Sequence, residues 1–277
     1  MNNIPAIPLG EWVESSLDWL TDVLSPLTRA ASAVVETGID NLVDLLLIIP
    51  PWILILIIAG VAWKVAGRNV MFLALFGFLF VWNIGLWEPT VATISLVFFA
   101  TILAVLLGVP LGILAALSDG FYAFIKPVLD FMQTMPAFVY LIPAIPFFGL
   151  GPVSAVFATV IFAVPPAIRL TALGIRQIDI ELIEAADAFG TTTMQKLVKV
   201  QIPLALPTIL AGVNQTIMLS LSMVVIAAMI GAGGLGGEVW RAIQRLRPGQ
   251  GFEAGMAVVI VAMVLDRITQ NIYRKKQ

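Results

Sequence analysis

The chain has 277 residues, of which 60% are hydrophobic and only 12% are charged, and its formal net charge is −2. Soluble domains carry about 25% charged residues, so this composition indicates a protein that crosses a membrane several times. The near-neutral charge gives no indication of a nucleic-acid partner. Cys and His are both absent. That absence excludes disulfides, thiol nucleophiles, zinc clusters and histidine acid–base chemistry, and we identify no catalytic residue and no metal site.

The first 47 residues differ from the remainder because acidic and large apolar side chains alternate there. Trp12, Leu17 and Trp19 stand among Glu11, Glu14, Asp18 and Asp22. This pattern predicts an amphipathic helix lying on the membrane surface, with a disordered tail as the alternative. The segment lacks the basic region and short apolar core of a cleavable signal peptide.

Seven apolar stretches follow, each close to the length of about 20 residues that a membrane-spanning helix needs. The fourth is the weakest, because Pro136, Pro143 and Pro146 interrupt it. We predict spans at residues 48–66, 70–87, 90–117, 133–150, 153–173, 206–230 and 253–272.

The distribution of Lys and Arg between these spans predicts their orientation, because basic residues collect in short cytoplasmic loops. Four basic regions fall on one side, which we assign to the cytoplasm together with the C-terminus; the N-terminus is then outside. These regions contain Lys64, Arg68, Lys126, Arg176, Lys196, Lys199, Arg274, Lys275 and Lys276. Arg241, Arg245 and Arg247 fall on the outer side instead. They indicate a surface that meets an acidic partner or closes an outer gate.

A polar segment at about residues 176–203 interrupts the apolar chain. Residues 180–189 are rich in Ala and follow Asp179, which predicts a short slim helix with an acidic N-cap. Gly190 is suited to end that helix in a left-handed turn, and Pro203 to open the next helix. The segment therefore predicts a rigid cytoplasmic projection for a partner protein, with an ordinary solvated loop as the alternative.

Residues 132–168 contain no charge but six prolines. Proline frees a backbone carbonyl, which is tolerated in a membrane only against protein or a water-filled cavity. We therefore interpret this run as part of a solute path, with kinked packing as the alternative. Its candidate wall residues are Met135, Phe138, Tyr140, Phe147 and Phe148, joined by Asn214 of the sixth predicted span. Aromatic faces of this kind attract quaternary ammonium groups. Polar side chains such as Asn214 more often bond a neighbouring helix.

Glu184, Ala185, Ala186 and Gly190 are followed at the right spacing by Val200-Gln-Ile-Pro203, which resembles the cytoplasmic coupling loop of ABC importer permeases. The departures from that family's pattern are Val200 and Ile202. Residues 130–140, 214–228 and 266–270 further resemble permease subunits of the glycine betaine/proline osmoprotectant (quaternary amine) uptake family. The resemblance implies a type I ABC importer transmembrane fold: all-α, with about seven spans. It makes residues 48–277 the permease domain and 1–47 an extracytoplasmic N-terminal segment.

The same resemblance implies a membrane-spanning permease in the prokaryotic plasma (inner) membrane. Its partners would be a second permease copy, two ATPase subunits and an extracytoplasmic substrate-binding protein. Glu184, Ala185, Ala186 and Gly190 would couple this chain to the ATPase, which would bind ATP and Mg. The chain lacks the phosphate-binding pattern G-x-x-x-x-G-K-[ST], so we expect no cofactor and no catalysis here. The alternatives are a permease for another solute, such as an amino acid, and an ion-coupled secondary transporter. The latter needs ionisable residues within the spans, and the central spans offer almost none.

Overall fold

The structure is a computed structural model that describes residues 8–274, and every regular element in this range is helical. Proline stands in the first turn of α2, α7 and α10 and begins α12, where its missing N–H costs nothing. Because every regular element in the described range is helical, the all-α prediction is confirmed. The helices are α1 (Leu9–Ile48), α2 (Pro51–Ala66), α3 (Arg68–Asn83), α4 (Trp87–Leu117), α5 (Asp119–Thr134), η1 (Ala137–Tyr140), α6 (Leu141–Phe148), α7 (Pro152–Arg176), α8 (Ile180–Ala188), α9 (Thr193–Lys196), the π-helical turn η2 (Leu197–Gln201), α10 (Ile202–Ile226), η3 (Ala227–Ile230), α11 (Gly234–Gln244) and α12 (Pro248–Arg274).

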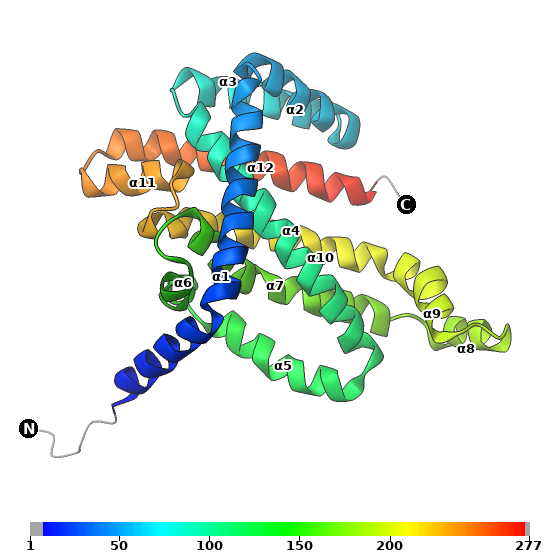
Figure 1. Cartoon of the computed structure of the whole chain (residues 1–277). Helices are drawn as coiled ribbons and strands as arrows, with labels where there is room; N and C mark the ends of the chain where they lie inside the picture. Colours follow the sequence, from blue (N-terminus) through cyan, green and yellow to red (C-terminus); the bar gives the residue numbers. More distant parts are fainter. Residues whose placement is uncertain (1–7, 275–277) are drawn as a thin grey trace, which may run out of the picture.

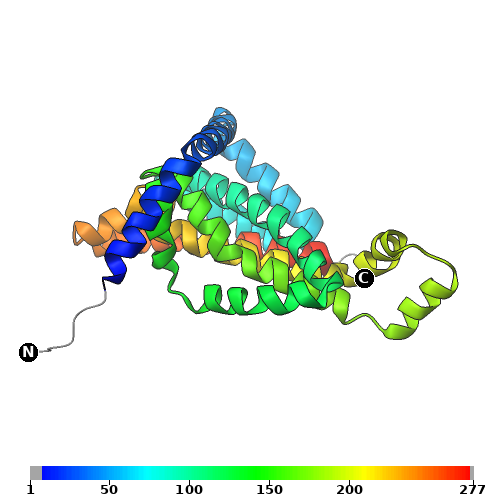
Figure 2. The same ribbon diagram turned by 60° about the horizontal axis from the view of Figure 1, so that its bottom comes forward.

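Apart from α1, which crosses the bundle, the long helices run roughly side by side, and the short ones gather at two opposite ends. Figures 1 and 2 show α8 and α9 at one end, where α12 also finishes. The opposite end carries α6 and the hairpin formed by α11 and the start of α12. We call these the α8 end and the α11 end. The connections α2–α3 and α4–α5 lie at the α8 end.

The structure shows helices that suit a membrane, but it does not fix the number of spans. Three stretches are long and apolar enough to cross: α4, α7 and the continuous helical stretch Thr193–Ile230. The number rises to five if two bent helix pairs each form one span, at 102° between α1 and α2 and at 112° after α5. The count of seven spans, and the orientation of the termini, therefore stay predictions.

The predicted fourth span at residues 133–150 is wrong as a single helix. The straight helix in this region is α5, which ends at Thr134, and the chain then bends by 112° into η1 and α6. Met135 and Pro136 adopt extended backbone at the bend, with ψ of 134° and 138°. A residue before proline avoids the helical region, so Pro136 accounts for the break.

The N-terminal segment forms one helix, α1, whose two halves differ in their surroundings. The first turns project away from the bundle, whereas the second half crosses it (Figure 1). Val35 and Ile39 are buried there, and a Cβ on Gly38 would lie 2.8 Å from the ring of Phe99. Residues 1–7 of the predicted surface segment, and Lys275 and Lys276 of the basic C-terminus, lie outside the described residues. Whether the first half of α1 rests on a membrane stays a prediction.

The centre of the bundle is a stack of α4, α7 and α10 held at short range by small residues. A Cβ atom on Gly108 or Gly112 of α4 would lie 2.5 Å or 2.6 Å from the Cβ atoms of Ala167 and Thr171 in α7, respectively. On an adjoining face of α7, a Cβ on Gly212 of α10 would lie 3.0 Å from the Cβ of Leu170. Small residues allow helix backbones to approach in lipid, where apolar burial gives no advantage.

We predict that Gly112→Leu destabilises the protein by about 2 kcal/mol, because the new side chain has no room against α7. The measurement is thermal unfolding of the detergent-solubilised protein. Gly60→Leu in α2 is the matched control, since a Cβ there meets no heavy atom within 4 Å. Equal unfolding temperatures for the two variants would contradict the close packing of α4 on α7.

Candidate functional site

The polar segment at the α8 end begins with α8, as the sequence predicts. Asp179 occupies the N-cap position, but its side chain makes no capping hydrogen bond, so that detail of the prediction is wrong. The helix therefore depends on its Ala-rich composition, which costs little side-chain entropy, and on how its C-terminus is closed.

The C-terminus of α8 is closed by Gly190, which has φ of +73°, the left-handed conformation predicted for it. The N–H of Gly190 donates to the carbonyl of Asp187 at 2.9 Å, and the N–H of Thr191 donates to that of Ala186 at 3.3 Å. These two bonds form the Schellman arrangement that terminates many helices. The hydroxyl of Thr191 also donates to the carbonyl of Ala186, at 2.8 Å. These bonds therefore fix the direction in which the chain leaves α8.

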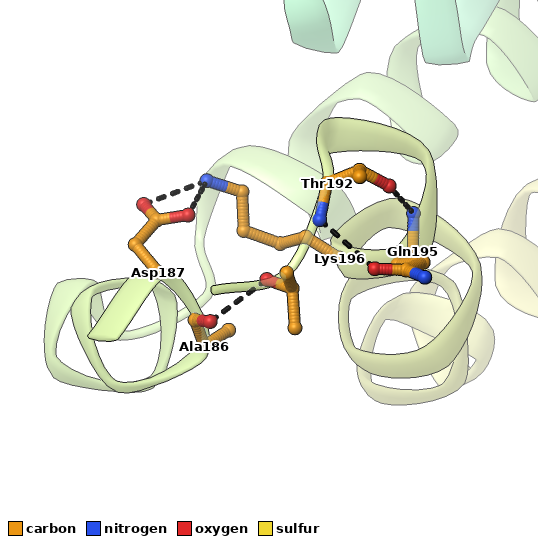
Figure 3. Close-up of polar contacts among 6 residues, drawn as sticks. Ala186, Asp187, Thr192, Gln195 and Lys196 are labelled. Carbon is orange, nitrogen blue, oxygen red and sulfur yellow. Dashed lines mark hydrogen bonds and ion pairs between the residues drawn. The ribbon is translucent and has the colours of Figure 1, made fainter. Parts of the chain in front are cut away.

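The returning chain is tied back to α8 by α9, as Figure 3 shows. The Nζ atom of Lys196 lies 2.7 Å and 2.8 Å from the two carboxylate oxygens of Asp187. Thr192 and Gln195 form a reciprocal capping box at the start of α9, with bonds of 3.0 Å and 3.3 Å. The two short helices and their turn therefore form one rigid projection, which we call the α8–α9 knob (residues 179–196).

The predicted coupling residues take different positions on this knob. Glu184 and Ala185 are exposed, whereas Ala186 is 8% exposed and faces the inside of the knob. The side chain of Glu184 makes no ion pair or hydrogen bond within residues 8–274. The knob also exposes large apolar side chains, which the sequence analysis did not single out. They are Ile180, Leu182, Phe189 and Met194, with Phe189 89% exposed. Large apolar residues within a polar segment are a sequence signal for a protein-binding surface, and the sequence analysis missed this signal.

A second group of contacts joins α7, which leads into the knob, to the turn between α4 and α5. Arg176, in the last turn of α7, donates from Nε and a terminal nitrogen to the carbonyl of Ala115 at 3.1 Å and 3.0 Å. The same guanidinium lies 2.6 Å from Asp119 and 4.3 Å from the ring centre of Tyr122. These contacts connect the end of α7 to both α4 and α5.

The candidate path residues differ in their burial and in their contacts. Tyr140 is 4% exposed, its hydroxyl donates to the carbonyl of Met132, and its ring packs on Phe162. Phe138 is exposed, and Met135 is half-buried against the core. Phe147 and Phe148 are half-buried neighbours whose ring centres lie 6.3 Å apart, and Phe148 stacks on Phe157 at 3.9 Å. The structure therefore gives Tyr140 a structural contact and leaves the path a prediction.

Asn214 of α10 connects to α12. Its amide nitrogen lies 3.3 Å from a carboxylate oxygen of Asp266, and its amide oxygen accepts from the hydroxyl of Thr269. Asp266 and Thr269 thus each have a partner on the facing helix. This bonding accords with the structural alternative for Asn214, since buried polar side chains in membrane bundles commonly bond across helices.

The chain is similar to known proteins over its full length. The family described as "Binding-protein-dependent transport system inner membrane component" matches residues 108–276, which include the α8–α9 knob. The glycine betaine transport system permease protein OpuAB of Bacillus subtilis is 49% identical over 100% of this chain and 98% of the relative. The glycine betaine/carnitine transport permease protein GbuB of Listeria monocytogenes is 49% identical over 99% of each. The glycine betaine/proline betaine permease protein ProW of Escherichia coli is 45% identical over 97% of this chain and 76% of the relative.

Among solved structures, a chain of the inward-facing MetNI methionine ABC transporter has the same fold. Its TM-score is 0.63 at 22% identity, covering 76% of this chain and 99% of that chain. The predicted ABC permease fold and membrane location are thereby confirmed, as is the resemblance to permeases of the glycine betaine uptake family. The chain belongs to the family of inner membrane components of binding-protein-dependent transport systems.

Proposed function

We propose that this chain is the membrane-spanning permease subunit of an ATP-driven importer of glycine betaine or a related compatible solute. The observation that carries the proposal is the identity of 49% over the whole chain to a glycine betaine permease. The family match covers only residues 108–276, so the whole-chain identity adds α1 to α3 to the similarity. This extent favours glycine betaine over amino acids, whose transporters share the fold at 20–22% identity.

In the proposed complex, two copies of the chain form the path, two ATPase subunits bind ATP and Mg, and a binding protein delivers the solute. The α8–α9 knob enters a groove on each ATPase subunit, where Glu184 and Ala185 face the partner and Phe189 fills an apolar site. The support is that the knob is rigid and carries unpaired charge beside exposed apolar area. Closure of the ATPase pair then moves α7 through the knob, and Arg176 transmits that movement to the α4–α5 turn.

The α8 end is cytoplasmic in this proposal and the α11 end is outside. The crossings are α2, α3, α4, α5, α7, α10 and α12, with α1 extracytoplasmic. The support is the basic residues near the α8 end together with the knob that must meet a cytoplasmic ATPase. Residues 1–47 then form the extracytoplasmic segment and residues 48–277 the permease domain.

Uptake of radiolabelled glycine betaine by the reconstituted complex tests the function. We expect ATP-dependent uptake that unlabelled glycine betaine competes away and a tenfold excess of an amino acid such as methionine does not. In the same assay, Phe147→Ala tests the proposed path, formed by Met135, Phe138, Tyr140, Phe147, Phe148 and Asn214. This change should lower the uptake rate, whereas Phe80→Ala on α3 should not. Uptake of the amino acid and none of glycine betaine would refute the proposed substrate.

We predict that Glu184→Lys or Gly190→Pro lowers uptake at least tenfold while the protein still inserts and unfolds at the wild-type temperature. The first change reverses a charge at the ATPase contact, and the second forbids the left-handed turn with φ of +73°. Uptake and ATP hydrolysis are measured together on the reconstituted complex. Glu181→Lys, on the same helix, is the matched control for charge. Normal uptake by both coupling variants would refute the role of the knob.

We predict that single cysteines at Ser15 and Gln250 are labelled from outside by a membrane-impermeant thiol reagent, whereas one at Thr193 is labelled only after the membrane is opened. Thr193 is used because Thr192 caps α9. The experiment needs no background correction, since the chain has no Cys of its own. Labelling of Thr193 in intact cells would reverse the proposed orientation.

A further inference from the structure

The α11–α12 hairpin (residues 234–252) carries three arginines at the end of the molecule opposite the knob (Figure 1). Arg241 lies 2.5 Å from Glu238 in the same helix. Arg245 and Arg247 are exposed and make no ion pair or side-chain hydrogen bond with any residue in 8–274. Arginine in a short outer loop opposes the charge rule that sets membrane topology. Its presence here therefore indicates a function that needs positive charge.

Leu246 lies between the two unpaired arginines and has an unusual backbone. Its φ is +53°, and it is the one non-glycine residue with positive φ among residues 8–274. The N–H groups of Leu246 and Arg247 donate to the carbonyls of Ile243 and Ala242, at 3.1 Å and 2.9 Å. These bonds make Leu246 the left-handed residue of a Schellman turn, a position at which glycine is preferred.

The side chain of Leu246 is 87% exposed, so the position combines an unfavourable backbone with an unfavourable exposure. Glycine would remove both costs and keep the turn. The positive φ and the exposed apolar side chain are both unfavourable in the isolated chain. Their combination at Leu246 indicates that this side chain contacts a partner molecule. Leu246 also borders an apolar groove of about 400 Å³, lined by Ala242, Ile243, Leu246, Arg247, Pro248 and Gly251.

The hairpin is firmly mounted on the bundle. The N–H of Leu235, in the first turn of α11, donates to the hydroxyl of Thr93 on α4 at 2.8 Å. A Cβ on Gly234 would lie 2.5 Å from the same hydroxyl, and one on Gly236 would lie 2.6 Å from the carbonyl of Val225. These close approaches fix the start of α11 against α4 and α10. A partner that binds the tip therefore acts directly on two helices of the central stack.

We propose that the tip of the hairpin, Arg245-Leu246-Arg247, docks an acidic surface of the extracytoplasmic substrate-binding protein. The proposal rests on the proposed function, which requires such a protein to bind at the α11 end. Arg245 and Arg247 pair with carboxylates of the partner, because guanidinium groups match carboxylates in two-point hydrogen bonds. Leu246 enters an apolar site between those carboxylates. A symmetric contact between the tips of two permease copies is disfavoured, since equal positive charges would face each other.

The test measures the affinity of the system's substrate-binding protein for the permease–ATPase complex in nanodiscs of phosphatidylcholine. We expect R245E/R247E to weaken binding about tenfold or more at low salt and to abolish most of its salt dependence. L246G should weaken binding several-fold without lowering the unfolding temperature of the permease. Arg68→Glu, an exposed charge reversal at the first residue of α3, is the matched control and should leave the affinity unchanged.

Wild-type affinity in both R245E/R247E and L246G would overturn the proposal. So would a loss of affinity that appears only in nanodiscs containing phosphatidylglycerol, because the tip would then bind lipid. A change in the number of permease copies per complex, with unaltered binding-protein affinity, would show that the tip contacts a second copy and would also overturn it.

Failure of the proposed function is distinguishable from failure of this inference. Binding is measured without transport, so the affinity comparison stands whatever solute the system imports. In the uptake assay, excess binding protein should restore the rate of R245E/R247E, because only docking is weakened. Excess binding protein should not restore Glu184→Lys, in which the coupling to the ATPase is damaged. An R245E/R247E rate that stays low at saturating binding protein would contradict a docking role.

Discussion

The structure depends on the close approach of α4, α7 and α10. A membrane protein gains nothing by burying apolar side chains away from apolar lipid, so its helices associate through van der Waals contact and hydrogen bonds. Gly108 and Gly112 bring α4 close to α7, and Gly212 brings α10 onto an adjoining face of the same helix. A Cβ atom would overlap α7 at Gly108 and Gly112 and would be tightly packed at Gly212. The three helices therefore behave as a packed unit, and both ends of the molecule are mounted on it.

The two ends are connected to this unit by different means. At the α8 end, Arg176 ties the last turn of α7 to the carbonyl of Ala115 and to Asp119. At the α11 end, Thr93 of α4 holds the first turn of α11. Helix α4 thus meets the knob region at its C-terminal end and the hairpin near its N-terminal end. A single helix in contact with both ends would connect the two partners proposed above.

The sequence predicted those features that depend on local chemistry and missed those that depend on distant residues. The Ala-rich run and Gly190 predicted α8 and its left-handed end, because helix propensity and positive φ are properties of a few neighbouring residues. Hydropathy placed a span at residues 133–150, and the prolines marked it as interrupted, but neither signal showed that the chain bends by 112° after α5. Neither hydropathy nor spacing indicates that Asn214 bonds Asp266. The exposed apolar groups of the knob were likewise hidden, since an apolar residue next to a helix end is as often buried as exposed.

The same Schellman turn closes α8 and α11, and the comparison bears on both ends of the molecule. In each case the two N–H groups that follow the helix donate to carbonyls in its last turn. At α8 the left-handed residue is Gly190, so the turn is unstrained and the exposed apolar group is its neighbour Phe189. At α11 the left-handed residue is itself apolar, Leu246. A turn that could be closed by glycine, as α8 shows, is closed by leucine where the side chain points outward between two arginines. The two turns end their helices in the same way and differ in the side chain that the left-handed residue exposes. We therefore assign Leu246 to partner recognition and Gly190 to shaping the turn.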